Sequence, residues 1–241
     1  MSLSGKVAVV TGGSRGIGHA VARALLARGA HVVISGTNES GLAEAADELR
    51  ALAGPGEQVL HAVADVREYA AVERLMQTAA EGLGGLDILI NNAGVGIFEP
   101  VADMSLDNWH AVIDTNLTGA FHCCRAALPH LRRRGGGWII NISSLAGKNP
   151  FAEGAAYCAS KSGLNAFSEA LMQEVRHDGV RVACVLPGSV QTGFGGHSRE
   201  QADWKLAPDD VAAVVTDLIG HASRSLPSRV EIRPSQPPKK K

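Results

Sequence analysis

The sequence predicts an α/β fold in which about seven parallel strands form a doubly wound sheet with helices on both faces. Short β-branched runs alternate with longer Ala- and Leu-rich stretches along most of the 241 residues. Hydrophobic residues make up 45% of the chain, which is enough to bury a substantial core. We find no internal repeat and no linker-sized stretch. We therefore expect a single domain over residues 1–233, followed by a flexible C-terminal tail at 234–241.

Predicted strands and helices follow one another in the order that parallel strands require. The expected strands span residues 6–11, 31–35, 58–64, 86–91, 137–142 and 181–186, with a seventh at 229–233. The expected helices span residues 17–28, 39–53, 69–81, 106–133, 155–177 and 208–221. Because Pro234 comes directly after the last strand, we expect that strand to stop early and its edge pairing to be weakened.

Composition excludes several classes of partner. The 23 Lys and Arg residues nearly balance the 24 Asp and Glu residues, so no net field attracts nucleic acid or a membrane surface. The N-terminus has no apolar run long enough for a signal peptide, so we expect a cytoplasmic protein that binds a small molecule. No metal site is expected, and reduced, buried thiols are expected at Cys123, Cys124, Cys158 and Cys184.

A glycine-rich loop follows the first predicted strand and opens the first predicted helix. Gly12, Gly16 and Gly18 allow a sharp turn, a close approach of backbone to a pyrophosphate, and tight packing of the helix on the sheet. An ordinary tight turn is the alternative interpretation. The position between strand and helix favours a Rossmann-type dinucleotide site.

The spacing Gly-x3-Gly-x-Gly, together with Asn91-Asn92-Ala93-Gly94 after the fourth strand, resembles the short-chain dehydrogenase/reductase family. The chain is similar to its 3-oxoacyl-ACP reductase-like members. The resemblance implies hydride transfer between a nicotinamide cofactor and a carbonyl or secondary alcohol. It also implies cofactor contacts at Gly12, Ser14, Arg15, Gly16, Ile17, Gly18, Asp65, Val66, Asn92, Ala93, Gly94, Tyr157, Lys161, Pro187, Gly188, Val190 and Thr192. As an alternative, Asp65 caps the helix that follows it.

The end of the second strand bears on the choice of cofactor. NAD enzymes usually carry an acid there, which repels a 2′-phosphate. This chain has the neutral donors Ser35, Thr37 and Asn38 instead, and Arg15 offers a planar cationic fork to the phosphate. NADP(H) is therefore favoured. NAD(H) stays the alternative if Arg15 points to solvent.

Tyr157 and Lys161 lie one helical turn apart, so their side chains share a face. The pKa of a free tyrosine is about 10. A neighbouring ammonium and an oxidised nicotinamide are expected to lower that pKa. Tyr157 would then exchange a proton with the substrate. The resemblance implies that Lys161 also holds the nicotinamide ribose.

Two further polar residues complete the expected catalytic group. Ser144 ends the fifth strand, where its hydroxyl would donate a hydrogen bond to the substrate oxygen. Ser143 is the alternative candidate for this role. The resemblance implies that Asn116 interrupts its helix and holds a water; otherwise it is a polar residue that merely distorts the helix. A serine hydrolase is disfavoured because Gly-x-Ser-x-Gly is absent. A protein that senses NADP(H) without turnover is the second hypothesis.

Substrate selectivity is expected from residues 193–206, with 95–98 and 148–151 near the reacting centre. Phe194 and Trp204 are candidate lid residues over an apolar ligand. The helices at 106–133 and 155–177 are more apolar than one sheet-facing stripe requires. We therefore expect a homo-oligomer, either a dimer or a homotetramer.

Overall fold

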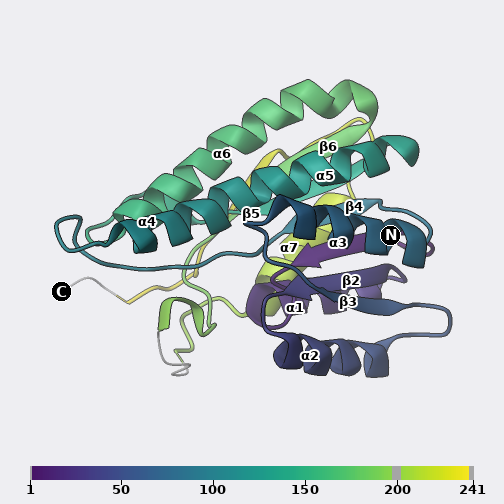
Figure 1. The fold of residues 1–241 in the computed structure, drawn as a ribbon, viewed down its shortest axis with the longest axis horizontal. Coiled ribbons are helices and arrows are strands. Elements are labelled where there is room, and N and C mark those ends of the chain that lie inside the picture. Colours follow the sequence, from purple (N-terminus) through teal and green to yellow (C-terminus); the bar gives the residue numbers. More distant parts are fainter. Residues whose placement is uncertain (1, 197–201, 239–241) are drawn as a thin grey trace.

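A seven-stranded parallel sheet in the order β3-β2-β1-β4-β5-β6-β7 forms the centre of the computed structural model (Figure 1). The structure describes residues 2–196 and 202–238. The strands are β1 (Val7–Thr11), β2 (His31–Gly36), β3 (Val59–Val63), β4 (Ile88–Asn91), β5 (Gly137–Ile142), β6 (Val180–Pro187) and β7 (Arg229–Ile232). The predicted fold class is confirmed.

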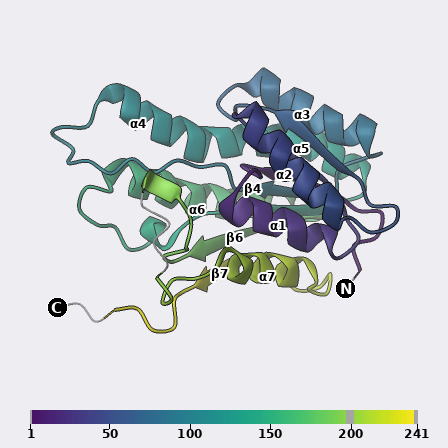
Figure 2. The same cartoon turned by 90° about the horizontal axis from the view of Figure 1, so that it is seen from below.

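Helices cover both faces of the sheet (Figures 1 and 2). One face carries α1 (Gly16–Leu26), α2 (Glu39–Leu52) and α7 (Pro208–Ile219). The other carries α3 (Tyr69–Gly82), α5 (Gly119–Arg133) and α6 (Ala155–Val175). Alternate strand residues point to opposite faces, so that Val10 packs under the first layer and Val9 under the second. Each layer thus has its own apolar core.

The strand order reverses between β1 and β4, which lie side by side. The chain leaves β1 toward β2 on one side, and it leaves β4 toward β5 on the other. A reversal of this kind opens a crevice outside the carboxyl ends of the strands, where ligands bind in doubly wound folds. The glycine-rich loop follows β1 and the Asn-Asn-Ala-Gly segment follows β4, so both motifs meet at this point.

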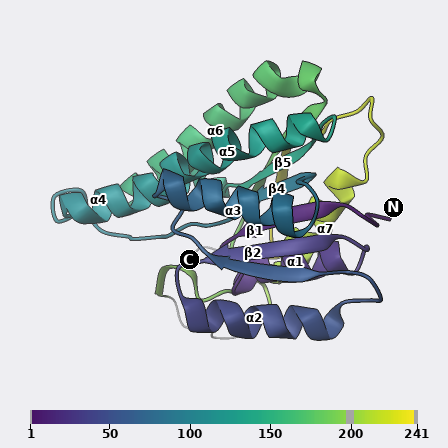
Figure 3. The ribbon, with the colours of Figure 1, turned by 45° about the vertical axis from the view of Figure 1, so that its right-hand side comes forward.

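The helix expected at 106–133 is divided into α4 (Leu106–Ile113), a π-helical turn (Asp114–Thr118) and α5. Pro129 is tolerated inside α5. Figure 3 shows α4 leading into α5 along the upper layer. Short 3-10 turns that the sequence did not predict occur at Leu145–Gly147, Arg176–Asp178 and Phe194–Gly196. The other elements lie within a few residues of their predicted bounds.

The last strand ends at Ile232, before Pro234, as expected. It nevertheless pairs with β6 along Cys184–Pro187, so the expected weakening of the edge pairing is not seen. Residues 234–238 contain no helix or strand, and 239–241 of the predicted tail lie outside the described residues. All four cysteines are free and buried, as predicted. Within the described ranges, no helix has the length and apolarity needed to cross a membrane.

Candidate active site

The glycine-rich loop is packed too closely for side chains. A Cβ on Gly18 would collide with the Gly12 carbonyl and the Asn92 amide. The Asn92 amide donates hydrogen bonds to the carbonyls of Thr11 and Gly12, both at 3.0 Å. Helix α1 begins at Gly16 with no acid in its first turn. Its N-terminal amides therefore suit a bound anion such as a diphosphate.

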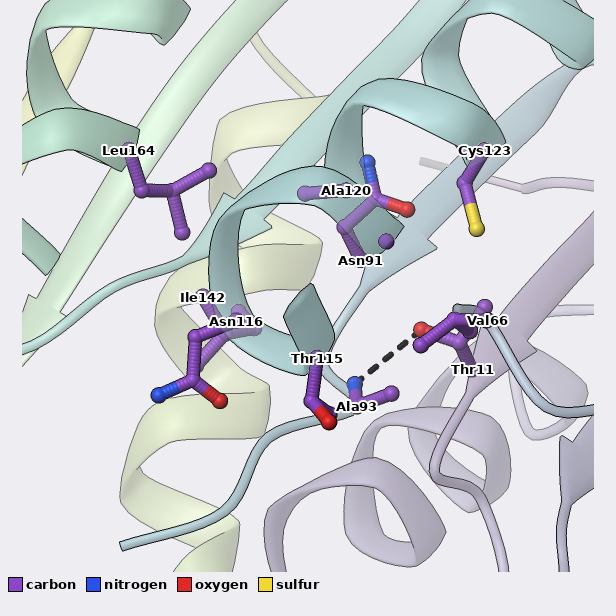
Figure 4. A pocket seen from close by; sticks show the side chains of 11 residues that line it. Thr11, Val66, Asn91, Ala93, Thr115, Asn116, Ala120, Cys123, Ile142 and Leu164 are labelled. Carbon is purple, nitrogen blue, oxygen red and sulfur yellow. Dashed lines mark hydrogen bonds between the residues drawn. The ribbon is translucent and has the colours of Figure 1, made fainter. Parts of the chain in front are cut away.

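Thr11, at the end of β1, holds the start of the glycine-rich loop against the segment after β4. The sequence did not predict this role. Its hydroxyl accepts hydrogen bonds from the backbone amides of Asn92 and Ala93, each at 3.0 Å, and donates to the Ile90 carbonyl at 3.4 Å (Figure 4). The available signal was a hydroxyl at the end of an otherwise apolar, buried strand.

The end of β2 presents a mixture of buried and exposed groups. Thr37 and Asn38 are exposed, and the Asn38 carboxamide caps α2 by accepting a hydrogen bond from the Gly41 amide at 2.8 Å. Ser35 is 0% exposed, and its hydroxyl has no hydrogen-bond partner among the described residues. This burial does not fit the donor role predicted for Ser35, because that role needs a hydroxyl at the surface.

Across from this strand end, the glycine-rich loop supplies two polar side chains. The Ser14 hydroxyl would lie 3.8 Å from a Cβ built on Gly36, which places it beside the end of β2. Arg15 is exposed at the residue before α1. A neutral and a cationic donor therefore border the strand end that has no acid.

Asp65 follows β3 and is held by Arg67. The guanidinium donates to both carboxylate oxygens, and these bonds keep the pKa of Asp65 below its usual value. Helix α3 begins at Tyr69 after Glu68, so Asp65 is not its cap. Val66 is buried, and its carbonyl lies 3.0 Å from the His122 imidazole.

Tyr157 and Lys161 lie in the first two turns of α6, as their spacing predicted. Lys161 is 4% exposed; its ammonium donates to the Ile142 carbonyl at 2.9 Å and lies 5.9 Å from the centre of the Tyr157 ring. Burial lowers the pKa of Lys161 to about 8, and the nearby Cys184 opposes this shift. A lysine with this pKa can lose or gain a proton near neutral pH.

Burial raises the pKa of Tyr157, and a hydrogen bond with Ser144 opposes the shift. The lowered pKa expected from the sequence depends on a bound oxidised nicotinamide and stays a prediction. Among the protein's own groups, desolvation outweighs the other contributions. The raised value keeps the phenol protonated at neutral pH. In this state Tyr157 can donate a proton.

The two serines after β5 have different partners. Ser144, whose hydroxyl also accepts from the Ala146 amide at 3.1 Å, faces Tyr157. Ser143 is buried and donates to the Lys161 carbonyl at 3.2 Å. Geometry therefore favours Ser144 over the fallback Ser143 as the hydroxyl beside the phenol.

Asn116 lies in the π-helical turn and connects three segments. Its carboxamide accepts from the Val95 amide at 2.8 Å and donates to the Val95 carbonyl at 2.9 Å and to the Ser160 hydroxyl at 3.0 Å. Ser160 donates in turn to the Tyr157 carbonyl at 2.7 Å. Asn116 and Thr11 line the same small pocket (Figure 4). Asn116 thereby fixes the loop after β4 against the helix that carries the phenol.

The segment after β6 returns over the glycine-rich loop. Pro187 is the last residue of β6, and the Gly188 amide donates to the Ile232 carbonyl at 2.8 Å. A Cβ on Gly16 would lie 3.2 Å from the Thr192 methyl, and Val190 forms a bridge with Leu206. Thr192 therefore lies beside the predicted cofactor loop, whereas Gly188 and Val190 contact the end of β7 and Leu206.

The two predicted lid residues, Phe194 and Trp204, lie in different surroundings. The Phe194 ring lies 5.6 Å from that of Tyr157, centre to centre. The ammonium of the neighbouring Lys205 lies 5.8 Å from the centre of the Trp204 ring. Residues 197–201 of the predicted selectivity segment lie outside the described residues.

The arrangement brings a phenol, an ammonium and a hydroxyl to one edge of the sheet, next to a glycine-rich anion site. No group of three or more metal-ligating side chains occurs in the part of the chain that the structure describes. Such a site can hold a diphosphate-containing ligand and pass a proton to an oxygen atom held by a hydroxyl.

This fold and these motifs are shared with a known family. A family profile described as short chain dehydrogenase matches residues 6–203. The chain belongs to the short-chain dehydrogenase family, and it is an oxidoreductase of that family. A ketoacyl reductase, HetN, from a Nostoc species is 39% identical over 90% of this chain and 76% of its own length.

Two solved structures are similar along almost their whole length. A metagenomic short-chain oxidoreductase in complex with NADP is 39% identical, covers 98% of this chain and 100% of its own, and superposes with a TM-score of 0.85. An alcohol dehydrogenase from the archaeon Thermococcus sibiricus, complexed with 5-hydroxy-NADP, is 30% identical, covers 98% and 99%, and has a TM-score of 0.89.

Proposed function

We propose that this chain is an NADPH-dependent carbonyl reductase, also able to oxidise the corresponding secondary alcohols. The observation that carries the proposal is the position of the Tyr157 phenol, which is hydrogen-bonded to Ser144 and whose ring centre lies 5.9 Å from the Lys161 ammonium. The HetN relative, a ketoacyl reductase, and the Thermococcus alcohol dehydrogenase support the same class of reaction.

Bound NADPH would supply a hydride to the carbonyl carbon. Ser144 donates a hydrogen bond to the carbonyl oxygen and Tyr157 gives that oxygen its proton, so the C=O double bond is replaced by new C–H and O–H bonds. Lys161 returns a proton to the phenolate, which its pKa of about 8 permits. Asn116 holds the segments that carry these groups in place. In the family resemblance, Lys161 also contacts the nicotinamide ribose.

The choice of NADPH rests on charge at the end of β2. No acid stands there, and Ser14 and Arg15 border the same region. A 2′-phosphate would meet donors and a cation instead of a repelling carboxylate. The NADP-bound relatives are consistent with this choice. NAD(H) is the alternative.

The test is consumption of NADPH absorbance over a panel of ketones and aldehydes, with wild-type protein and with Tyr157→Phe. We expect turnover by the wild type and a loss of about 10³-fold in kcat for the variant, because the proton donor is removed. NADPH binding measured by calorimetry should stay within about threefold of wild type, since the ring is kept.

The competing function is an NADP(H) sensor without turnover. Tight NADPH binding with no consumption on any carbonyl would favour the sensor over the reductase. Equal rates of turnover for wild type and Tyr157→Phe would contradict the role of Tyr157 as the proton donor. Assembly into a dimer or tetramer stays a prediction, which light scattering would check. The exposed apolar side chains of Leu106 and Trp109 on α4 support it.

A further inference from the structure

Three phenylalanines from three different loops meet around Tyr157. Phe98 follows β4, Phe151 precedes α6, and Phe194 follows β6. The Phe98 ring lies 5.5 Å from the Tyr157 ring at an interplanar angle of 75°, and the Phe194 ring lies 5.6 Å from it at 54°. Phe151 extends the group outward, 5.8 Å from Phe98. We call Phe98, Phe151 and Phe194 the aromatic cluster.

Two glycines make room for this cluster. A Cβ on Gly96 would lie 2.6 Å from the Phe194 ring and 2.9 Å from the Phe98 ring. A Cβ on Gly154 would lie 2.6 Å from the Phe151 ring. The loops are also tied to each other, because the Glu99 amide donates to the Glu153 carbonyl at 2.9 Å. The rings therefore meet because the backbone of two loops is shaped to admit them.

Two acidic residues lie next to members of the cluster along the chain. Glu99 follows Phe98 and Glu153 lies two residues after Phe151, on the two tied loops. Lys148, at the start of the segment that leads to Phe151, is paired with Glu231 at 2.6 Å. A substrate that carries phosphate groups would meet like charge here, whereas a neutral one would not.

We propose, on the basis of the carbonyl reductase function above, that the aromatic cluster is the substrate subsite and that it selects neutral ketones bearing an aromatic ring. Aromatic pairs prefer edge-to-face or offset contacts at ring spacings like those seen here. The Phe98 and Phe194 rings both lie against the Tyr157 ring. A phenyl group bound among them places an attached carbonyl beside the proton donor.

The test compares two ketones that differ only in the character of the ring, phenyl methyl ketone and cyclohexyl methyl ketone. We expect the wild type to favour the phenyl compound in kcat/KM by about tenfold. Phe98→Leu and Phe194→Leu should each reduce that preference by about 3- to 10-fold, because an aliphatic side chain keeps the apolar volume and removes the ring contact. Gly96→Ala should reduce it too, by displacing both rings.

Phe121→Leu is the matched control. Phe121 is 42% exposed on α5, and its ring contacts His122 and Phe167 instead of Tyr157. This variant should leave the phenyl preference unchanged. An acetoacetyl thioester of coenzyme A, which carries phosphates, should give a lower kcat/KM than the phenyl ketone.

Binding to the NADP⁺-loaded protein separates this proposal from the assigned catalysis. Calorimetric titration with 1-phenylethanol and 1-cyclohexylethanol reports on the subsite without requiring turnover. Tighter binding of the phenyl alcohol that is lost in Phe194→Leu supports the subsite, even if Tyr157→Phe disproves the proton donor. Equal affinity for both alcohols, or a preference for the thioester, overturns the subsite proposal. A phenyl preference that is unchanged in Phe98→Leu, Phe194→Leu and Gly96→Ala overturns it as well. Turnover of any ketone would still support the reductase function.

Discussion

The polar side chains of the candidate site are buried to different degrees in the two halves of the sheet. In the half formed by β4, β5 and β6, Lys161 and Asn116 are almost fully buried, and their polar atoms have hydrogen-bond partners. In the half formed by β1, β2 and β3, Thr37, Asn38 and Arg15 are exposed. The first half thus holds its reactive groups within the packing of the fold, whereas the second offers surface side chains that can change without disturbing the core.

This difference suggests that the reaction is harder to alter by mutation than the choice of cofactor. A buried polar group that loses its partner costs the free energy of its desolvation. An exposed side chain is replaced at little cost in stability. Substitutions of the buried groups near β5 and α6 should therefore change catalysis or folding, and substitutions of the exposed Arg15 and Thr37 should change cofactor preference alone.

The largest expected effect in this comparison concerns the two adjacent serines. Ser144→Ala should lower kcat by about 10²- to 10³-fold, because it removes the hydroxyl that faces Tyr157. Steady-state kinetics with saturating NADPH measures this loss.

Ser143→Ala is the control for that variant. It removes a buried hydrogen bond to the Lys161 carbonyl, so it should cost about 1 kcal/mol of unfolding free energy and change kcat by less than about threefold. If the two variants lost activity equally, the assignment of separate roles to the serines would be wrong.

The buried lysine should make stability depend on pH. Burial lowers the pKa of Lys161 from 10.5 to about 8, so between these values the unfolded chain binds more protons than the folded one. Stability contributed by this group therefore rises with pH through that interval. Below about pH 8 the buried charge lowers stability in full, and this cost declines as the pH rises from about 8 toward 10.5.

Lys161→Met lacks this titration. Relative to the variant, the wild type should gain about 1 to 2 kcal/mol of unfolding free energy between pH 7.5 and pH 9.5. Urea unfolding of both proteins at each pH measures the difference, and titrations shared by the two chains cancel. If the difference in unfolding free energy between the two proteins stayed constant with pH, or changed in favour of the variant, Lys161 would have an ordinary pKa.

A smaller effect is expected at the exposed end of β2. Arg15→Ala should reduce the preference for NADPH over NADH by about 2- to 5-fold, because one exposed charge pair is worth at most about 1 kcal/mol. The ratio of kcat/KM for the two cofactors measures it.

Asn38→Asp provides a second test of the same surface. Aspartate caps a helix as well as asparagine does, so α2 should keep its stability while the added charge weakens NADPH binding. Unchanged cofactor ratios in both variants would mean that another surface recognises the 2′-phosphate.

Much of this fold could be predicted from the sequence. Alternating β-branched and Ala/Leu-rich segments placed all seven strands, and the i,i+4 spacing placed Tyr157 beside Lys161. The hydroxyl of Thr11 and the burial of Ser35 could not be foreseen, because strand alternation alone does not say which polar residue turns inward at a strand end. The family resemblance implied that Asn116 interrupts its helix, but the π-helical form of that interruption was not predicted.

The sequence placed 95–98, 148–151 and 193–206 near the reacting centre, but the ring contacts of the aromatic cluster and the desolvation of Tyr157 were beyond it for a different reason. Both depend on how Phe98 and Phe194, 96 residues apart in the chain, pack around one phenol. Motif spacing describes contacts within one helix or loop. It does not describe the desolvation that arises when several loops close over the same group.

Transfer of a labelled hydride tests the central claim most directly. Wild-type protein is supplied with a phenyl ketone and with NADPH that carries deuterium at C4 of the nicotinamide, with each of its two C4 positions labelled in turn. Mass spectrometry of the alcohol should show one deuterium on the former carbonyl carbon from one labelled cofactor and none from the other, and Tyr157→Phe should form this product about 10³-fold more slowly. Alcohol without deuterium from both cofactors, or labelled product at the wild-type rate from Tyr157→Phe, would contradict the account.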